Sequence, residues 1–281
     1  MSKTPETANL AVFCDFENVA LGVRDANIEK FDIRLVLEKL LLKGSIVVKK
    51  AYCDWARYKE FKPLMHEAAF ELIEIPHLRQ SGKNSADIRL VVDALDLCYT
   101  KTHVDTFVIV SGDSDFSPLV SKLRENNKTV IGVGVKNSSS DLLIANCDEF
   151  IYYDDLARSR PVRRSTRAPA PRRSSASSSA SAPAEPSAEK PADKAPDTGN
   201  VQEAVDLVME TITAIAEERG SEEKIWGSMV KQTLRRRRPG FNEASYGFRS
   251  FNLLLEEAAK RGLLELEHDE KSGGVIVRRL G

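Results

Sequence analysis

Two apolar segments of the sequence each end in a turn that carries carboxylates. Residues 10–14 lead into Asp15, Phe16, Glu17 and Asn18, and residues 106–110 lead into a stretch that contains Asp113 and Asp115. If the two segments are neighbouring strands of a parallel sheet, their carboxyl ends place Asp15 and Asp113 at the same edge. A third aspartate, at position 87, stands near the start of a helical pattern and can approach that edge from above.

Carboxylates gathered in this way imply a cation. Without matching bases they repel one another at neutral pH, and their pKa values rise unless a positive ion neutralises them. A set of oxygen ligands favours Mg²⁺ or Mn²⁺. Such an ion can activate a water and stabilise charge on a phosphoryl group, so Asp15, Asp87, Asp113 and Asp115 predict a phosphodiester hydrolase.

Single members of this set could also have purely structural roles. Asp87 follows Ser85 at a helix start, and Asp115 precedes Phe116, so either carboxylate could serve only as a helix cap or dipole partner. Asp93 lies six residues beyond Asp87, where a helix turns it away, and we expect it to be structural. A purely structural role for all of these aspartates at once is less expected than such a role for any single one of them.

Two further enzyme classes are compatible with parts of the same residue set. Asp113-Ser114-Asp115 also fits the metal motif of sugar-nucleotide transferases, but that function leaves Asp15 and Asp87 without a role. Ser111 and Ser114 could be nucleophiles, yet no histidine or lysine stands near them in the sequence to activate them.

The elements that must position these carboxylates alternate along residues 8–156. Apolar strand-like runs separated by helical patterns predict right-handed crossovers and a mostly parallel sheet with helices on both faces. The expected strands are 10–14, 45–53, 71–75, 106–110, 129–135 and 150–153. The expected helices are 31–42, 59–69, 86–99, 118–126 and 139–146.

The composition changes sharply after residue 156. Residues 157–199 are rich in arginine, then in serine, alanine and proline, and have no apolar periodicity, so we expect a disordered linker. Residues 200–281 form a second expected domain, with helices at 201–218, 224–237 and 246–260 and strands at 263–266 and 274–278. Three helices followed by a hairpin are typical of a winged helix-turn-helix domain.

The motifs of the first part resemble one known family. Asp15-Phe-Glu-Asn18, Asp87 with its flanking residues 83–93, and Ser111-Gly-Asp-Ser-Asp-Phe116 together resemble the NYN branch of the PIN-like nucleases, over about residues 8–156. The resemblance implies a PIN-like sheet and a Mg²⁺- or Mn²⁺-dependent ribonuclease site. It implies that Asp15, Asp87, Asp113 and Asp115 hold the metal and that Asn18 orients a metal water or a phosphate.

Basic residues supply candidate contacts to RNA. Lys83 and Arg79 stand on a polar loop before Asp87, where they could meet a substrate phosphate or simply face solvent. In the second domain, Trp226, the run of four arginines from Arg235 to Arg238 and the aromatic residues from Phe241 to Phe251 resemble an OST-HTH (LOTUS) domain. That resemblance implies binding of RNA or docking of a protein partner. The arginine run (Arg235, Arg236, Arg237 and Arg238) is the expected RNA contact, and the aromatic positions Trp226, Phe241, Phe248 and Phe251 are expected in the core.

Composition limits the remaining choices. The formal net charge of −1 gives no overall basic field, and the four histidines show no spacing that indicates zinc. The four cysteines, Cys14, Cys53, Cys98 and Cys147, are expected to be buried free thiols in a reducing compartment. No apolar run is long enough to cross a membrane and residues 1–9 do not resemble a signal peptide, so we expect a cytoplasmic protein.

Three functions stay open at this point. The first is a metal-dependent ribonuclease, expected to be an endonuclease, whose C-terminal domain recruits RNA or a partner. The second is a regulatory or scaffolding RNA-binding protein with a catalytically silent PIN-like fold. The third is a metal-dependent enzyme acting on a small nucleotide, which gives the basic linker and the second domain no clear role.

Overall fold

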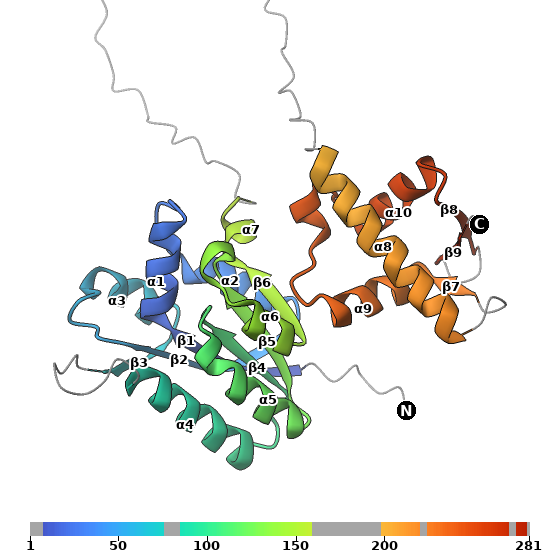
Figure 1. The fold of residues 1–281 in the computed structure, drawn as a ribbon. Helices are drawn as coiled ribbons and strands as arrows, with labels where there is room; N and C mark the ends of the chain where they lie inside the picture. Colours follow the sequence, from blue (N-terminus) through green and yellow to red (C-terminus); the bar gives the residue numbers. More distant parts are fainter. Residues whose placement is uncertain (1–7, 76–84, 159–197, 220–223, 270–273, 280–281) are drawn as a thin grey trace, which may run out of the picture.

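The computed structural model of the chain describes residues 8–75, 85–158, 198–219, 224–269 and 274–279. Within these segments, residues 8–158 form an N-terminal unit and residues 198–279 form a C-terminal unit (Figure 1). The N-terminal unit is built on a six-stranded sheet with the order β3-β2-β1-β4-β5-β6. Its strands are β1 (Ala8–Asp15), β2 (Gly44–Cys53), β3 (Glu71–Glu74), β4 (Thr106–Val110), β5 (Thr129–Gly134) and β6 (Glu149–Tyr152).

Every pair of neighbouring strands in this sheet is parallel, which confirms the predicted fold class. The central strands are apolar on both sides because helices cover both faces; all five residues of β4 are buried. The two carboxylate-bearing strands are neighbours, which was the condition for their aspartates to share one edge, since Cys14 of β1 lies opposite Val110 of β4. The chain leaves β1 and β4 toward opposite halves of the sheet, and such a switch in strand order opens a crevice at the strands' carboxyl ends.

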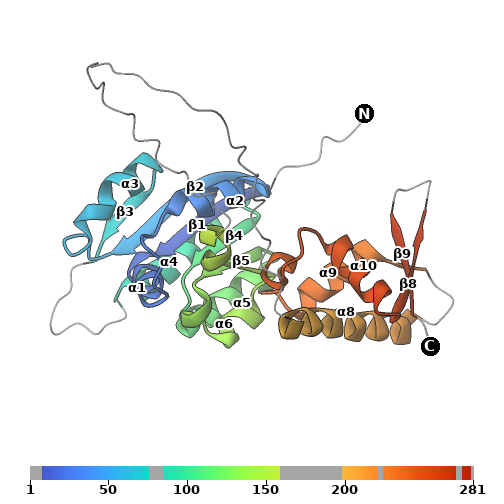
Figure 2. The same ribbon diagram turned by 90° about the horizontal axis from the view of Figure 1, so that it is seen from above.

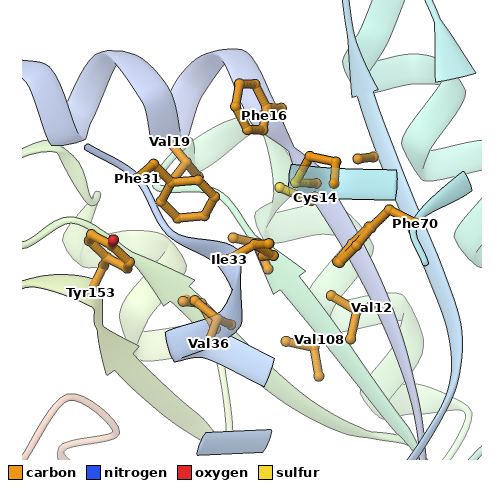
Figure 3. Close-up of a cluster of buried hydrophobic side chains, with 14 of the residues drawn as sticks. Val12, Cys14, Phe16, Val19, Phe31, Ile33, Val36, Phe70, Val108 and Tyr153 are labelled. Atoms are coloured by element: carbon orange, nitrogen blue, oxygen red, sulfur yellow. The ribbon is translucent and has the colours of Figure 1, made fainter. Parts of the chain in front are cut away.

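Two buried clusters fill the space on the two faces of the sheet (Figure 1). One lies under α1 (Phe16–Asp25), α2 (Ile33–Leu41), α3 (Lys62–Glu67) and α7 (Tyr153–Arg158). The other lies under α4 (Ser85–Thr100), α5 (Ser117–Glu125) and α6 (Asp141–Asn146). Figure 3 shows the first cluster, in which Phe16, Phe31 and Ile33 meet the inward side chains of β1 and β4.

Helix α1 was not among the helices predicted from the sequence. It begins directly after β1, with Asp15 as its N-cap, and its buried positions Phe16, Val19, Gly22 and Val23 follow helical spacing. The segment was interpreted only as a carboxylate-bearing turn. No loop separates this strand from the helix, so the sequence pattern contains no turn signal that marks where the strand ends and the helix begins.

The C-terminal unit contains three long helices and a small antiparallel sheet with the order β7-β9-β8. Its elements are α8 (Thr198–Arg219), β7 (Ile225–Trp226), α9 (Gly227–Arg237), the 3-10 helix η4 (Glu243–Tyr246), α10 (Phe251–Lys260), β8 (Leu264–His268) and β9 (Val275–Arg279). Three helices with a β8–β9 hairpin agree with the winged helix-turn-helix architecture expected for this part of the chain.

Two boundaries in the C-terminal unit were predicted wrongly. Ile225 and Trp226, expected in a helix, form a short strand because they pair with Val277 and Ile276 of β9. Residues 246–250, also expected in a helix, contain Gly247 at a φ of 87°, which a helix does not allow, and α10 starts only after Ser250. The predicted core positions Phe241 and Phe251 are buried, and Phe248 packs against the same cluster, whereas Trp226 is only half-buried.

The two units touch along β6, an edge strand of the large sheet (Figures 1 and 2). The backbone N–H of Phe150 donates to the carbonyl oxygen of Pro239 at 3.0 Å. Next to it, Asp155 accepts hydrogen bonds from the hydroxyl of Ser245 at 2.7 Å and from the side-chain amide of Asn242 at 3.1 Å. The loop after α9 therefore covers part of this edge of the sheet.

The predicted linker, residues 157–199, falls mainly outside the described residues. At its ends the structure adds residues 157 and 158 to α7 and residues 198 and 199 to α8. The four cysteines lie in the described part of the chain and are buried free thiols. Among the helices that the structure describes, none has both the length and the apolar character to cross a bilayer.

Candidate metal and catalytic site

The candidate site is built around Asp15, the last residue of β1, whose side chain is only 6% exposed. One of its oxygens, Oδ1, accepts a long hydrogen bond of 3.4 Å from the backbone N–H of Asn18. The other, Oδ2, accepts a hydrogen bond of 3.1 Å from the hydroxyl of Ser111. Asp15 therefore caps helix α1 and is at the same time connected to the turn that follows β4.

Ser111 and Asn18 hold the two turns together. The Ser111 hydroxyl, which is fully buried, donates to Asp15 and accepts from the backbone N–H of Asp113 at 3.2 Å. From the other side, Oδ1 of Asn18 accepts the backbone N–H of Gly112 at 2.9 Å. The side-chain oxygen of Asn18 thus positions the loop between β4 and η2 (Ser114–Phe116), and its expected role toward a water or a phosphate stays a prediction.

Burial makes Asp15 an unusual carboxylate. Desolvation first, and then the charges of Asp87 and Asp113, raise its pKa to about 7, against the lowering effect of the hydrogen bonds from Asn18 and Ser111. A helix cap alone would be stabilised in its ionised form and would keep a low pKa. The raised pKa therefore indicates that burying the ionised form of Asp15 costs free energy. Its hydrogen bonds with Asn18 and Ser111 do not compensate for that cost.

Asp87 belongs to the same electrostatic cluster. It stands in the first turn of α4, and burial first, then the charges of Asp113, Asp115 and Glu17, raise its pKa to about 6. Glu17 was not among the predicted site residues, although it lies inside the motif that begins at Asp15. Its side chain is 39% exposed and lies 3.6 Å from the guanidinium of Arg57. We call Asp15, Glu17, Asp87, Asp113 and Asp115 the carboxylate cluster.

Asp113 and Asp115 lie at the open side of the cluster. Oδ1 of Asp113 accepts the backbone N–H of Asp115 at 3.0 Å, so Asp113 caps the short helix η2. Asp115 does not cap the following helix α5, whose N-cap is Phe116. The side chain of Asp115 is exposed and makes no hydrogen bond or ion pair that the structure records. Asp113 thus has one oxygen engaged in the cap, and Asp115 keeps its carboxylate for solvent or a ligand.

The carboxylate oxygens of this cluster are suitable ligands for a divalent cation, but the side chains are not arranged around a single position. In the described segments, no three histidine, cysteine, aspartate or glutamate side chains stand as a ready-made group for a metal ion. The members interact in pairs, and the raised pKa values of Asp15 and Asp87 mark an excess of negative charge that a hard cation would relieve.

Asp93 is confirmed as a structural residue. It accepts hydrogen bonds from the hydroxyl of Tyr52 at 2.9 Å and from Nε of Arg89 at 3.0 Å, and Lys50 lies 3.4 Å away. Burial works to raise the pKa of Asp93, but the hydrogen bond from Tyr52 and the positive charges of Lys50 and Arg89 lower it. This pattern is the opposite of that at Asp15 and Asp87.

The structure describes only some of the predicted basic contacts. Lys83 and Arg79 lie outside the described residues. In the C-terminal unit, helical spacing spreads the four arginines: Arg237 pairs with Glu210, Arg235 and Arg238 line cavities where the two units meet, and Arg236 lines a cavity within the C-terminal unit.

Replacement of Ser111 tests whether the turn after β4 must be held in place. In Ser111→Ala, Asp15 and the backbone of Asp113 each lose a buried partner, so we expect a stability loss of about 1–3 kcal/mol and a divalent-ion affinity about 10- to 100-fold lower. Isothermal titration calorimetry with Mn²⁺ and urea unfolding measure the two effects. Ser45→Ala, at an exposed position of β2, is the matched control, and an unchanged Mn²⁺ affinity in Ser111→Ala contradicts the positioning role.

Several known proteins are similar to the N-terminal unit. Meiosis regulator and mRNA stability factor 1 of Xenopus tropicalis is 25% identical over 154 residues, which cover 55% of this chain and 9% of that protein. The protein of the same name from Bos taurus is 26% identical over 160 residues, or 57% of this chain and 9% of its own length. The matched segment is thus a small part of these relatives.

Two further matches come from microorganisms. An uncharacterized protein of Methanocaldococcus jannaschii is 29% identical over 121 residues, which cover 43% of this chain and 45% of that protein. The crystal structure of a protein of unknown function from Vibrio parahaemolyticus aligns with a TM-score of 0.49 and 27% identity, covering 55% of this chain and 98% of that one. Residues 9–154, more than half of the chain, match the NYN domain, and the chain therefore belongs to the NYN domain family.

Proposed function

We propose that this protein is a Mg²⁺- or Mn²⁺-dependent ribonuclease, acting as an endonuclease, whose site is the carboxylate cluster. The observation that carries the proposal is the pair of raised pKa values, about 7 for Asp15 and about 6 for Asp87, at the crevice between β1 and β4. Buried carboxylates that raise one another's pKa at a strand-end crevice are typical of functional sites.

RNA as the substrate is supported by the comparisons. The chain belongs to a family that resembles the PIN-like nucleases, and relatives in two vertebrates are named as mRNA stability factors. The shared segment is 9% of those proteins, so their activity is extended to this chain only as part of the proposal.

We assign different roles to the residues of the cluster and to the two residues that hold it in place. Asp15, Asp87, Asp113 and Asp115 would hold the ion, and Glu17 adds negative charge beside Asp87. The chemistry that such an ion supplies when bound is activation of a water as nucleophile and stabilisation of negative charge on the phosphoryl oxygens. Ser111 and Asn18 act as positioning residues, because they keep Asp15 and the backbone of residues 112 and 113 at a fixed separation.

The C-terminal unit is proposed to be an OST-HTH (LOTUS) domain that recruits RNA or a protein partner. Its helices and hairpin are compatible with that family, and Arg236 and Arg238 are exposed at the end of α9. A second binding module on the same chain raises the concentration of RNA near the nuclease site.

Cleavage of labelled single-stranded RNA by the full chain tests the proposal. The wild type should cut with Mg²⁺ or Mn²⁺ and not with EDTA, and Asp113→Asn should lower the rate by roughly 10²-fold or more, because several kcal/mol of charge stabilisation are lost. Asp96→Asn makes the same change in charge at an exposed position of α4 and should leave the rate unchanged. Full metal-dependent activity in Asp113→Asn overturns this assignment.

A catalytically silent RNA-binding protein is the second candidate. It is favoured by one observation, that the described carboxylates do not stand as a ready-made metal group. Retention of RNA in a gel shift without cutting under any metal condition would select it over the ribonuclease.

A further inference from the structure

A groove with apolar walls begins at the carboxylate cluster and runs between α4, α5 and α6. Its volume is about 720 Å³, within the range of roughly 300–1,000 Å³ that is common for small-molecule sites. Ile88, Val91 and Val92 of α4 form one side, and Pro118 and Leu142 contribute to the other. Asp87 and Asp115 also line the groove, so it shares two residues with the cluster.

The apolar side chains of this groove are unusually exposed. Ile88 is 63% exposed, Val92 is 55% exposed and Leu142 is 59% exposed. Large apolar side chains gathered on a surface next to a site indicate an occupant, because leaving them in water is unfavourable. The chain itself places them there, since Ile88 and Val92 are one helical turn apart on α4 and Leu142 is in the first turn of α6.

The charges of the groove restrict what can occupy it. The described residues that line it include no lysine or arginine, and its only charged residues, Asp87 and Asp115, belong to the carboxylate cluster, so the rest of the groove offers no counter-charge to a phosphate or a carboxylate. A neutral planar ring needs no counter-charge, and its contact with the apolar side chains of the groove is favourable. Serine hydroxyls are available beside those walls: Ser114 and Ser121 line the groove, and the buried Oγ of Ser117, at the same groove, has no hydrogen-bond partner among the described residues.

We propose that this groove is a nucleobase subsite, which receives an unpaired base of the substrate next to the phosphate at the carboxylate cluster. The inference rests on the proposed nuclease function and adds to it the residues that hold the base: Ile88, Val92 and Leu142. Enzymes that act on nucleic acids hold an unstacked base between apolar side chains and bind its polar edge by hydrogen bonds. A phosphate at the cluster leaves its neighbouring base at the mouth of the groove, because Asp87 and Asp115 border both.

The test uses the full chain with the double substitution Ile88→Ser and Leu142→Ser. Both side chains are exposed, so the fold does not depend on them, and Leu42→Ser is the matched control. Leu42 is 82% exposed and follows α2, on the opposite face of the sheet. On single-stranded RNA the double variant should lose about tenfold in kcat/KM, the scale of one lost base contact, and the control should lose nothing.

Abasic oligonucleotides show whether a base is the missing contact. Removing the base beside the cleaved bond should slow the wild type about tenfold, and the double variant should cut intact and abasic RNA at the same rate, because the two changes remove one interaction. Equal cutting of intact and abasic RNA by the wild type overturns the subsite while leaving the nuclease function in place.

Measurements of RNA binding and of the molecular mass of the protein distinguish the remaining outcomes. If the wild type does not cut, fluorescence anisotropy of the same RNA with Mg²⁺ should still give weaker binding for the double variant, and equal binding overturns the subsite. Absence of both cutting and binding overturns the subsite and the proposed function together. A wild-type dimer in light scattering that becomes a monomer in the double variant, with unchanged kcat/KM, would assign the groove to a protein interface instead.

Discussion

Asp15→Asn should remove RNA cleavage and, in the absence of metal, make the fold more stable at alkaline pH. The variant keeps the size of the side chain and an acceptor for the N–H of Asn18, but it removes a charge that is 6% exposed and costly to bury. We expect the cleavage rate to fall by about 10³-fold or more, because Asp15 is the most deeply buried carboxylate of the site and each 1.4 kcal/mol is tenfold in rate.

The stability gain should depend on pH in a defined direction. The pKa of Asp15 is raised from an ordinary 3.8 to about 7, so the folded state holds its proton where the unfolded state has released it. The wild type therefore loses stability as the pH rises from 3.8 to about 7, whereas the variant does not. At pH 8 the variant should be more stable by on the order of 2–4 kcal/mol, since each pKa unit is about 1.4 kcal/mol.

Urea unfolding in EDTA at several pH values measures this difference. The advantage of Asp15→Asn should grow between pH 4 and 7 and then level off, while Asp96→Asn should show no such trend. Added Mn²⁺ should stabilise the wild type and leave Asp15→Asn unchanged. A variant that is less stable than the wild type at pH 8 would show that the buried carboxylate is compensated by contacts that the structure does not reveal.

Phe16→Ala should produce the largest loss of stability in the N-terminal unit, about 3–5 kcal/mol, the range for removal of a buried aromatic ring. Phe16 is fully buried, and its ring contacts four others at centroid distances of 5.0 to 5.8 Å, namely those of Phe31, Trp55, Tyr58 and Phe61. These contacts hold the first turn of α1, which also carries Glu17 and Asn18. Loss of the ring should therefore lower RNA cleavage even though Phe16 touches no substrate.

Urea unfolding at pH 6 gives the stability change, and cleavage below the unfolding midpoint gives the change in activity. Phe16→Leu fills most of the same space and should cost less than Phe16→Ala. An unchanged midpoint in Phe16→Ala would mean that the aromatic cluster does not hold α1 on the sheet.

The sequence pattern predicted the parallel sheet and the aspartates at its edge, but it did not predict the contacts that hold those aspartates in position. The strand β4 is buried throughout and is followed at once by the turn that carries Asp113, so the pattern predicted the strand and its turn, whereas its place beside β1 was only assumed. Ser111 was considered only as a nucleophile, since its contact with Asp15 joins positions 96 residues apart and leaves no local pattern. Glu17 was passed over because its partners, Asp87 and Arg57, lie in other elements.

The same limit explains the errors in the C-terminal unit. Ile225 and Trp226 have the apolar character of the helix that follows them, and only pairing with β9 decides that they are a strand. The run from Arg235 to Arg238 was interpreted as an RNA contact, and that interpretation stays a prediction. On a helix, successive residues point about 100° apart, so the arginines are distributed over different neighbours.

The contact between β6 and the loop after α9 has a consequence for the behaviour of the protein in solution. An edge strand with free N–H groups can add the strand of another molecule, and this is a common start of aggregation. Pro239 occupies the N–H of Phe150, and its own nitrogen has no hydrogen to offer a further strand. The C-terminal unit thus covers one hydrogen-bond donor of this edge, and we expect an N-terminal unit cut free of it to associate with other molecules more readily than the full chain.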